Sequence, residues 1–470
     1  MTALELSRLQ FAVVTIYHYL FVPLSISLAS LTALLQTAAY RTGDPRWQRS
    51  TLVAGKLLMI TFAVGIVTGL VQEFQFGLSW SSFARFYGDV FGPTLAIEGM
   101  LAFFLEATFL GLWWFGADRL HPALHLATIW IVAIGTLISA YVILAANAFM
   151  QNPVAYTLDP DTGRARLGSF TDLLTNEVVL AAFPHTIAGA FAGGGALLLA
   201  IGAYRVRRGD PDGQWRSFTR VGAWTTLVAG ALVALTGDLL GKVMTAVQPM
   251  KMAAAEALYA TQAGAPFSLF AVGAPGEKEP FFSLDVPWLL SFLATGDPTA
   301  TVQGIDDLQA QYTAQFGPGD YVPVVPMAYW SFRFMIGFGV LATVVAAWVL
   351  WRTRRGRELG AGHPVDRWLL RLLWTVPVLP ALAATAGWLF TETARQPWLV
   401  FGLFRTEDGV SPGLTPVELA ASLAGFALVY GVLAVVWVRL VLRVARTAGD
   451  DPAPVPADDS EPDRPLVPSY

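Results

Sequence analysis

Two carboxylates interrupt an apolar run that would otherwise be an ordinary membrane-spanning helix. The run is LAIEGMLAFFLEATFLGLWW (residues 95–114), and its carboxylates are Glu98 and Glu106. A charged side chain at bilayer depth costs at least about 2 to 3 kcal/mol, so such residues usually have a function. As a regular helix, the run would place the two carboxylates about 12 Å apart along the axis and roughly 80° apart around it. This spacing predicts two successive stations for a proton rather than one shared site.

Histidine and methionine side chains form a second set of reactive residues. His18, His185 and Met335 lie in apolar segments, and imidazole and thioether are ligands of electron-transfer haem iron. Each residue also has a structural interpretation, because a single His in a membrane is as often a packing residue, and Met is common core filler. We assign that structural role to the remaining histidines, which are His121, His125 and His363.

The composition is that of a polytopic membrane protein. The chain has 470 residues, of which 55% are hydrophobic and 14% are charged. A soluble domain would carry about 25% charged residues. It contains no cysteine, which excludes disulfides, iron–sulfur clusters with cysteine ligands and thiolate-bound haem. The N-terminal sequence MTALELSRLQ lacks the basic region of a signal peptide, so we expect the first helix to remain in the mature protein.

Apolar runs of about 20 residues, enough to cross a 30 Å hydrocarbon core, occur nine times. We therefore predict an all-α integral membrane protein with nine transmembrane helices near residues 11–35, 53–72, 92–114, 125–147, 181–203, 221–240, 330–351, 369–391 and 416–438. The alternate loops carry eighteen and eight Lys or Arg residues, respectively. The positive-inside rule then places the N-terminus outside and the C-terminus in the cytoplasm.

The segment between the sixth and seventh helices differs from the short connections elsewhere. We divide the chain into helices one to six (1–240), an extracytoplasmic loop (241–329), helices seven to nine (330–442) and a cytoplasmic tail (443–470). A loop this long is usually functional or disordered. The tail is rich in Pro and Asp, and we expect it to be disordered. No internal repeat is visible, which weakens the case for an inverted-repeat transporter.

The unusual polar residues share one depth once the orientation is set. That orientation places five of them, each on a different helix, in the outer half of the membrane: His18, Glu98, His185, Met335 and Glu392. Two known haem architectures do not fit. Copper-containing oxidases need at least six histidines and an adjacent pair, and this chain has five without such a pair. The paired histidines of the cytochrome b of quinol–cytochrome c reductases are also missing.

Several long motifs closely resemble subunit I of cytochrome bd quinol oxidase, in its short-loop form. They occur in the family's order from Ser7 to about Val438 and read SRLQFAVVTIYHYLFVPLS, GLVQEFQFGLSWS, YGDVFGPTLAIEGMLAFFLEATFLGLWWFG, ILAANAFMQNP, FPHTIAGA, SFRFMIGFG and GWLFTETARQPW. The resemblance implies an enzyme that oxidises membrane quinol and reduces O2 to water through three haems. These are a low-spin haem b, a high-spin haem b and a haem d, the last replaced by haem b in some members, and they lie toward the outer side of the bundle.

The matching motifs imply ligands residue by residue. His185 and Met335 match the axial ligands of low-spin haem b, and Arg333 matches a cation near its propionates. His18 and Glu392 match the axial ligands of the two high-spin haems, although the motifs do not say which of these haems is haem d. We also expect Glu98 to approach a high-spin haem iron. Trp388 matches an aromatic residue that assists electron transfer between haems, and its structural alternative is packing.

The outer loop resembles the family's quinol-binding loop. In VQPMKMAAAEALY, the residues Gln248, Lys251 and Glu256 match its quinol-site residues, and Glu256 could accept a quinol proton. The alternative is a solvated amphipathic segment. Some relatives have a hydroxyl directly after the second carboxylate, whereas this chain has Ala107 and then Thr108. A proton path must here use water, Thr108 or Ser139 of the neighbouring helix.

The resemblance gives a direction to the chemistry. Electrons pass from quinol to the haem of His185 and Met335 and then to the high-spin pair, while protons rise from the cytoplasm through Glu106 and then Glu98. A proton gradient would arise from this vectorial uptake and release, without pumping. Partners would be menaquinol or ubiquinol, O2, membrane lipid, a second large subunit (subunit II) and small single-span subunits, with no nucleic acid, in a bacterial cell membrane. The alternatives are a cyanide-insensitive bd-type oxidase without haem d and, from another class, a proton-coupled secondary transporter.

Overall fold

Nine long apolar helices form the body of the protein. The computed structural model describes residues 1–209, 213–272, 282–357, 359 and 364–448, and His363 lies outside these ranges. Within them, nine helices are long and apolar enough to cross a membrane, as predicted. They are α1 (Ala3–Thr42), α2 (Pro45–Leu78), a third span of α3 (Ser81–Gly99), η1 (Met100–Glu106) and α4 (Ala107–Phe115), α5 (Pro122–Gln151), α7 (Glu177–Arg208), α8 (Gln214–Val247), α12 (Val325–Arg352), the span Val365–Thr393 with α14 (Val378–Thr393), and α15 (Pro416–Thr447).

The helices extend well past the segments predicted from hydropathy. Helix α1 has 40 residues, or about 60 Å at 1.5 Å per residue, twice the hydrocarbon thickness. Its N-terminus is closed by a capping box between Thr2 and Glu5, which satisfies backbone N–H groups beyond the apolar run. Helix α15 likewise continues to Thr447, so residues 443–447 of the predicted disordered tail are helical. Polar caps rather than the apolar pattern set these ends.

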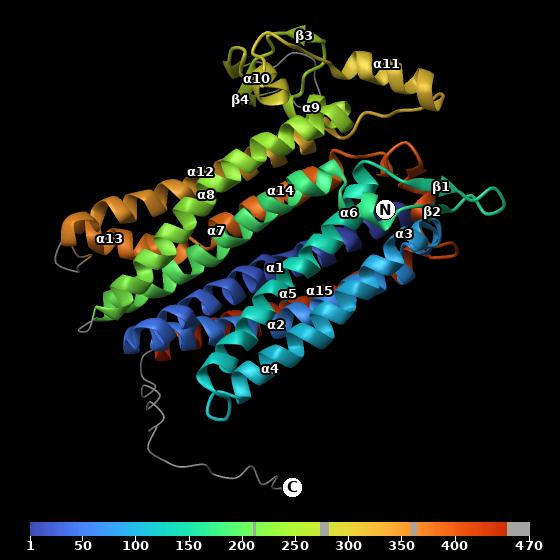
Figure 1. Ribbon diagram of the computed structural model, residues 1–470. Helices are drawn as coiled ribbons and strands as arrows, with labels where there is room; N and C mark the ends of the chain where they lie inside the picture. The colour runs from blue at the N-terminus through green and yellow to red at the C-terminus, as the bar shows by residue number, and fades with distance from the viewer. Residues whose placement is uncertain (210–212, 273–281, 358, 360–363, 449–470) are drawn as a thin grey trace, which may run out of the picture.

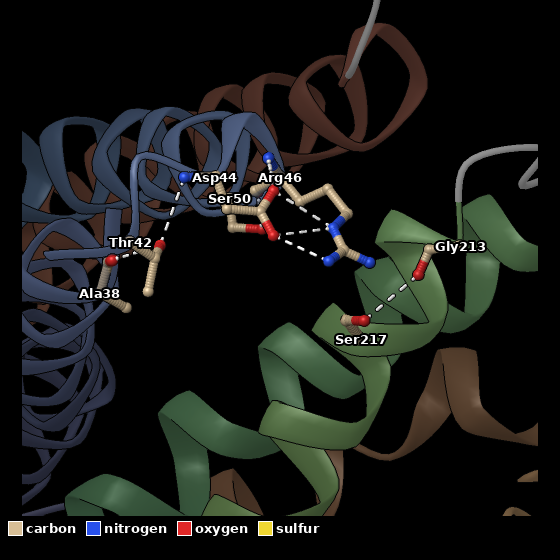
Figure 2. Close-up of polar contacts among 7 residues, drawn as sticks. All are labelled: Ala38, Thr42, Asp44, Arg46, Ser50, Gly213 and Ser217. Carbon is tan, nitrogen blue, oxygen red and sulfur yellow. Dashed lines mark hydrogen bonds and ion pairs between the residues drawn. The ribbon is translucent and has the colours of Figure 1, made fainter. Parts of the chain in front are cut away.

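The turn between α1 and α2 shows how local chemistry reverses the chain (Figure 2). Gly43 adopts a left-handed φ of 66°, which ends α1 at low steric cost. Asp44 then caps α2, because its carboxylate accepts the Arg46 backbone N–H at 2.8 Å and also pairs with the Arg46 guanidinium. The side chain of Arg49 donates to Gln214 at 3.4 Å, which ties this turn to the start of α8.

Helices α7 and α8 pack against each other almost backbone to backbone. A Cβ added at Gly222 of α8 would lie 2.3 Å from the Leu199 backbone nitrogen of α7. A Cβ at Gly202 of α7 would lie 2.8 Å from the Thr219 nitrogen of α8. Small residues allow such close approach between helices in lipid, where dispersion contacts replace the hydrophobic driving force. Helix α1 packs against α7 of this pair, and α12 packs against α8.

The third membrane span is not a regular α-helix. Its middle seven residues, Met100–Glu106, form the π-helix η1 between α3 and α4. A π-turn has i→i+5 hydrogen bonds and is frequent at functional sites. The predicted angle of 80° between Glu98 and Glu106 assumed a uniform α-helix, and it is therefore wrong for this chain. Apolar periodicity cannot reveal a local change in hydrogen-bond register.

The long segment between α8 and α12 folds as a small cap at one end of the bundle (Figure 1). Its elements are α9 (Pro249–Glu256), β3 (Gln262–Ala263), β4 (Phe267–Val272), β5 (Phe282–Val286), α10 (Leu289–Thr295), β6 (Thr301–Val302) and α11 (Ile305–Phe316). Antiparallel pairs join β3 to β6 and β4 to β5, with Phe267 opposite Val286. Because α9 packs on both α8 and α12, the cap is anchored to the helices at its two ends.

Other short elements occupy the two ends of the bundle. The end with the cap also holds the N-terminus, the hairpin of β1 (Tyr156–Leu158) and β2 (Ala165–Leu167), and α6 (Phe170–Leu174) (Figure 1). The hairpin of β7 (Trp398–Val400) and β8 (Phe404–Arg405) follows α14, and η4 (Glu407–Gly409) comes next. At the opposite end, η2 (Arg354–Gly356), α13 (Pro364–Leu372) and η3 (Leu373–Thr375) connect α12 to α14.

Candidate functional site

The predicted axial ligands lie on four of the long helices, and three of them face a glycine. His18 of α1 faces Gly69 of α2, where an added Cβ would lie 3.2 Å from the imidazole. His185 of α7 faces Gly237 of α8 at the same 3.2 Å. In the third pair, an added Cβ at Gly387 of α14 would lie 2.8 Å from the sulfur of Met335 on α12. A larger residue at any of these glycines would displace the histidine or methionine side chain that faces it.

Hydroxyl groups orient both imidazole rings. The Nδ1 atom of His18 lies 3.0 Å from the Thr68 hydroxyl, and that of His185 lies 3.3 Å from the Thr236 hydroxyl. Each threonine also donates to a backbone carbonyl of its own helix. In both cases Nε2 is the nitrogen left for another partner. Ligating histidines normally have such a hydrogen bond on the ring nitrogen that does not bind the metal. The threonines precede Gly69 and Gly237 in the sequence, so one Thr–Gly dipeptide serves each ring.

His125 is different, because both of its nitrogens are already satisfied. Its Nε2 lies 2.7 Å from the Trp113 carbonyl, and its Nδ1 lies 2.9 Å from the Gln36 amide. Gln36 in turn accepts from the Trp113 indole at 2.6 Å, so its amide nitrogen faces the histidine. This closed network leaves His125 no free lone pair for iron. The structural role predicted for it agrees with this geometry, and His121 caps α5 through its side chain.

Glu392 ends α14 and is held by two protein partners. One oxygen pairs with the Arg395 guanidinium at 2.5 Å, and the other faces the Asn147 amide of α5 at 3.4 Å. A carboxylate has about four acceptor positions, so these two contacts leave capacity for an iron ligand. Arg395 is fully buried and has two nitrogens without a partner in the described residues. Sequence reasoning missed both partners, although each lies inside a motif quoted for the resemblance.

The third span supplies the two carboxylates predicted to carry protons. Glu98 faces Glu73 of α2 within hydrogen-bonding contact. Glu106, which is 4% exposed, lies against Gly135 of α5, and its Oε1 has no hydrogen-bond partner among the described residues. A buried oxygen without a partner costs free energy unless water fills the gap. Glu73 was missed because it falls just past the predicted second helix, although a carboxylate beside a membrane span is itself a signal.

The predicted quinol-site residues separate into two groups, at the start and at the end of α9. Lys251 is buried, its amine donates to Gln151 Oε1 of α5 at 3.0 Å, and it lies over the Phe390 ring. Gln248 donates to the backbone carbonyl of the same Gln151 at 2.8 Å. Burial lowers the pKa of Lys251 to about 7, with Arg395 adding to this shift and Glu392 opposing it. An amine with this pKa can exchange protons near neutral pH.

Glu256 lies at the other end of α9 and faces α12. Its carboxylate forms a buried ion pair with Arg333 at 2.6 Å. Burial raises the pKa of Glu256, and the attraction of Arg333 opposes this shift only in part. Arg333 also donates to the carbonyls of Ser268 and Ala255 and stacks on Tyr329. Its five N–H groups thus all face protein acceptors, so a haem propionate could bind Arg333 only by displacing one of them.

Trp388 lies one residue after Gly387, on the part of α14 that faces α1. Its ring centroid lies 6.4 Å from that of Phe11 on α1, and Phe11 in turn lies 6.0 Å from Trp80. Trp388 therefore lies against the helix of His18, while its neighbour Gly387 faces Met335 of α12. Within the described ranges, no three His, Cys, Asp or Glu side chains gather as a site for a bare metal ion. The predicted ligands are instead spread singly, as haem axial ligands are.

Comparison with known proteins identifies the family of this chain. The family model for cytochrome bd terminal oxidase subunit I matches residues 6–449. The chain belongs to this family. It is 40% identical to cytochrome bd ubiquinol oxidase subunit 1 of Bacillus subtilis over 94% of this chain and 93% of that protein. It is 34% identical to cytochrome bd-II ubiquinol oxidase subunit 1 of Escherichia coli, over 94% and 96%.

The fold agrees with this family as well. The structure of bd oxidase from Geobacillus thermodenitrificans superposes with a TM-score of 0.85 at 29% identity, covering 95% of this chain and 98% of that chain. Membership makes the chain a multi-pass membrane subunit of a respiratory terminal oxidase, a haem-binding quinol:oxygen oxidoreductase. The numbering of subunits in these relatives implies a second subunit. The family assignment replaces the alternative of a proton-coupled transporter.

Proposed function

We propose that this chain oxidises a membrane quinol beneath its outer cap and delivers the electrons to three haems at which O2 is reduced to water. The observation that carries the proposal is the position of α9. This eight-residue helix buries Lys251 against α5 and α14, and it buries Glu256 against α12. Two residues able to exchange protons are thereby held next to the helices that bear Met335 and Glu392.

The proposed ligands are those that the motifs imply. His185 and Met335 would hold a low-spin haem b, while His18 and Glu392 would each hold a high-spin haem, one of them haem d or a haem b in its place. When bound, the haems carry the electrons and bind O2. The glycines facing His18, His185 and Met335 support the assignment, because each keeps the neighbouring helix clear of the ligand side chain. The hydroxyls of Thr68 and Thr236 support the ring orientations.

The protein's own groups would manage the protons. A quinol gives up two protons as it gives up two electrons, and Lys251 and Glu256 are the candidate acceptors, with Gln248 as a hydrogen-bonding partner. Protons for water would enter from the cytoplasmic side and pass Glu106 before Glu98. The contact between Glu98 and Glu73 adds a second carboxyl group at the end of this path. The unpaired oxygen of Glu106 supports a water at that point.

The direction of these steps would make the reaction electrogenic without a pump. Quinol protons leave at the cap, on the outer side of a bacterial cell membrane, while the protons that form water come from the cytoplasm. Trp388, which lies against Phe11 of α1, is the candidate residue for assisting electron transfer between the haems. Subunit II, and in some members small single-span subunits, would complete the complex in the lipid. The names of relatives include both ubiquinol and menaquinol oxidases, so either quinol is a candidate.

One preparation tests the proposal. The complex is purified with its second subunit, and its reduced-minus-oxidised absorption spectrum is recorded together with quinol-dependent O2 consumption. The expected result is haem b bands, a far-red haem d band and O2 uptake that requires added quinol. A spectrum without the far-red band would favour the bd-type oxidase that carries haem b instead. Absence of haem bands, or O2 uptake that does not depend on quinol, would overturn the proposal.

A further inference from the structure

Gln151, the last residue of α5, contacts two of the three proposed quinol-site side chains, those of Gln248 and Lys251. Its side-chain Oε1 accepts from the Lys251 amine at 3.0 Å, and its backbone carbonyl accepts from the Gln248 amide at 2.8 Å. The three residues belong to segments about 100 positions apart in the sequence. The MQNP motif that contains Gln151 has no role in the chemistry described so far. Its contacts, however, place it at the proposed quinol site.

A second hydrogen bond fixes the orientation of the Gln151 amide. Its Nε2 donates to the Asn147 Oδ1 one turn earlier on α5, at 2.8 Å. The carbonyl oxygen must therefore point toward Lys251, and a flipped amide would lose both contacts. Asn147 in turn faces Glu392 at 3.4 Å. Gln151 is thus held by the helix that carries it and is not free to follow the lysine.

The partner of the buried amine is neutral. In the described part of the chain, no carboxylate lies within ion-pairing distance of the Lys251 amine, and its hydrogen bond goes to the amide of Gln151. An amide can accept from both the charged ammonium and the neutral amine. A carboxylate partner would instead hold the lysine in its charged form. The amide therefore fixes the position of the amine without fixing its protonation state.

A small cavity lies beside this amine. It has a volume of about 10 Å³ and is lined in part by Gln248, Lys251, Tyr312, Arg395 and Trp398. Four of these five side chains have a buried polar atom without a partner in the described residues, namely the Gln248 oxygen, the Tyr312 hydroxyl, two Arg395 nitrogens and the Trp398 nitrogen. A cavity of this size holds about one water. The amine is thus held at the wall of a polar space.

We propose that Gln151 is the positioning residue of the quinol site: its side chain holds the Lys251 amine at the wall of the polar cavity, and its backbone carbonyl holds Gln248. This inference rests on the proposed function, because it assigns a role within the same site. It adds a residue from a transmembrane helix to a site otherwise built from the cap. It also predicts that the Gln151 side chain acts only through Lys251.

The test is a double-mutant cycle on the purified two-subunit complex. The variants are Q151L, which removes the acceptor at similar volume, K251M, and the double variant. We expect Q151L to lower kcat/KM for quinol by about tenfold or more, the effect of losing a hydrogen bond to a charged group. In the K251M background the same change should have no further effect, since coupled residues are not additive. The reaction of pre-reduced complex with O2 should stay within about twofold of wild type.

Two further variants separate positioning from folding. Q151E keeps an acceptor for Lys251 but, as a carboxylate, holds the amine in its charged form, so it should retain a KM for quinol near that of wild type while the rise of the rate with pH moves to higher pH. S291A removes a buried hydroxyl of the cap that bonds the backbone of Ala265 and Ala300 in the described residues, away from this cavity, and it should change thermal stability but not the KM for quinol. If Q151L and K251M have additive effects, or if Q151L alone is neutral, the positioning role is wrong while the proposed function stands. If K251M itself leaves quinol oxidation unchanged, the quinol-site assignment of Lys251 in the proposed function fails.

Discussion

Glu256 and Arg333 form a buried ion pair, 2.6 Å between Oε2 and Nη2, that joins the end of α9 to α12 two residues before Met335. Both side chains are almost fully buried, at 2% and 7% exposed. The pair therefore links the candidate proton acceptor of the cap to the helix that carries a proposed haem ligand. It is a direct electrostatic attachment of the cap to α12.

Replacing Glu256 with Gln should affect both stability and quinol oxidation. Removal of one charge from a buried pair leaves Arg333 uncompensated, at a cost of about 3 kcal/mol or more. Loss of a general base costs roughly 10²-fold in rate. Thermal unfolding and quinol-dependent O2 uptake of the complex measure the two effects. The control is E407Q, which removes a partner of Arg405 that is 63% exposed and should cost less than about 1 kcal/mol. Equal behaviour of the two variants would contradict the role of the buried pair.

Replacing Glu106 with Gln should slow O2 reduction without loss of haem. The change keeps the shape of the side chain against Gly135 but removes a group that can carry a proton. We expect turnover to fall by roughly 10²-fold, the lower range for loss of an acid–base group. Haem content follows from the absorption spectrum, and turnover from O2 consumption. The matched control is E177Q at the start of α7, where the carboxylate faces Asn152 in an exposed contact. Unchanged turnover in E106Q would remove Glu106 from the proton path.

Gly387→Ala should disturb the low-spin haem. The new Cβ would lie 2.8 Å from the sulfur of Met335, so the thioether must move away from its present position. We expect a reduced amplitude of the low-spin haem band, with the other bands retained. Gly337→Ala on α12 is the control, because an added Cβ there meets nothing within 4 Å and should even favour the helix by about 1 kcal/mol. A low-spin band of full amplitude in Gly387→Ala would argue against Met335 as a ligand.

Quinol oxidation should depend on pH through Lys251. Burial sets the pKa of this amine at about 7, so it is protonated below that pH and able to accept a proton above it. The groups that act on it are Arg395, which lowers its pKa, and Glu392, which raises it. The initial rate at saturating quinol should therefore rise with pH through about 7 and then level off. In K251M this inflection should disappear, whereas K242M, which removes a partly buried partner of Asp238, should retain it.

The same pKa makes a prediction about stability. The unfolded chain holds the Lys251 proton up to about pH 10.4, whereas the folded chain releases it near pH 7. Between these values the unfolded state binds more protons, so this group stabilises the folded state progressively as pH rises. Below about pH 7 the amine is charged in both states, and its burial then lowers the free energy of unfolding by the full amount. In K251M the rise in the free energy of unfolding between pH 7 and pH 9 should be smaller than in the wild type. An equal rise in both proteins would contradict the assignment.

The sequence by itself determined the membrane architecture and most of the candidate ligands. Nine apolar runs predict nine spans because lipid requires each crossing segment to satisfy its own backbone, which makes hydropathy nearly sufficient. Residues such as His18 and Glu392 were visible because polar groups are rare and costly at that depth. The motifs around them also identified the family, which the comparisons confirmed.

Only the tertiary structure decided which of these groups meet. Gln151 and Lys251 are 100 positions apart, and Arg333 and Glu256 are 77 apart, so no local pattern could pair them. The π-helix at Met100–Glu106 changes the geometry of Glu98 and Glu106, because hydrogen-bond register does not follow from apolar periodicity. Arg333 shows the same limit, since its donors are used by the cap rather than left free. The burial of a residue and its hydrogen-bond or ion-pair partners depend on how the whole chain packs. They determine the chemistry of residues that the sequence identifies only as candidates.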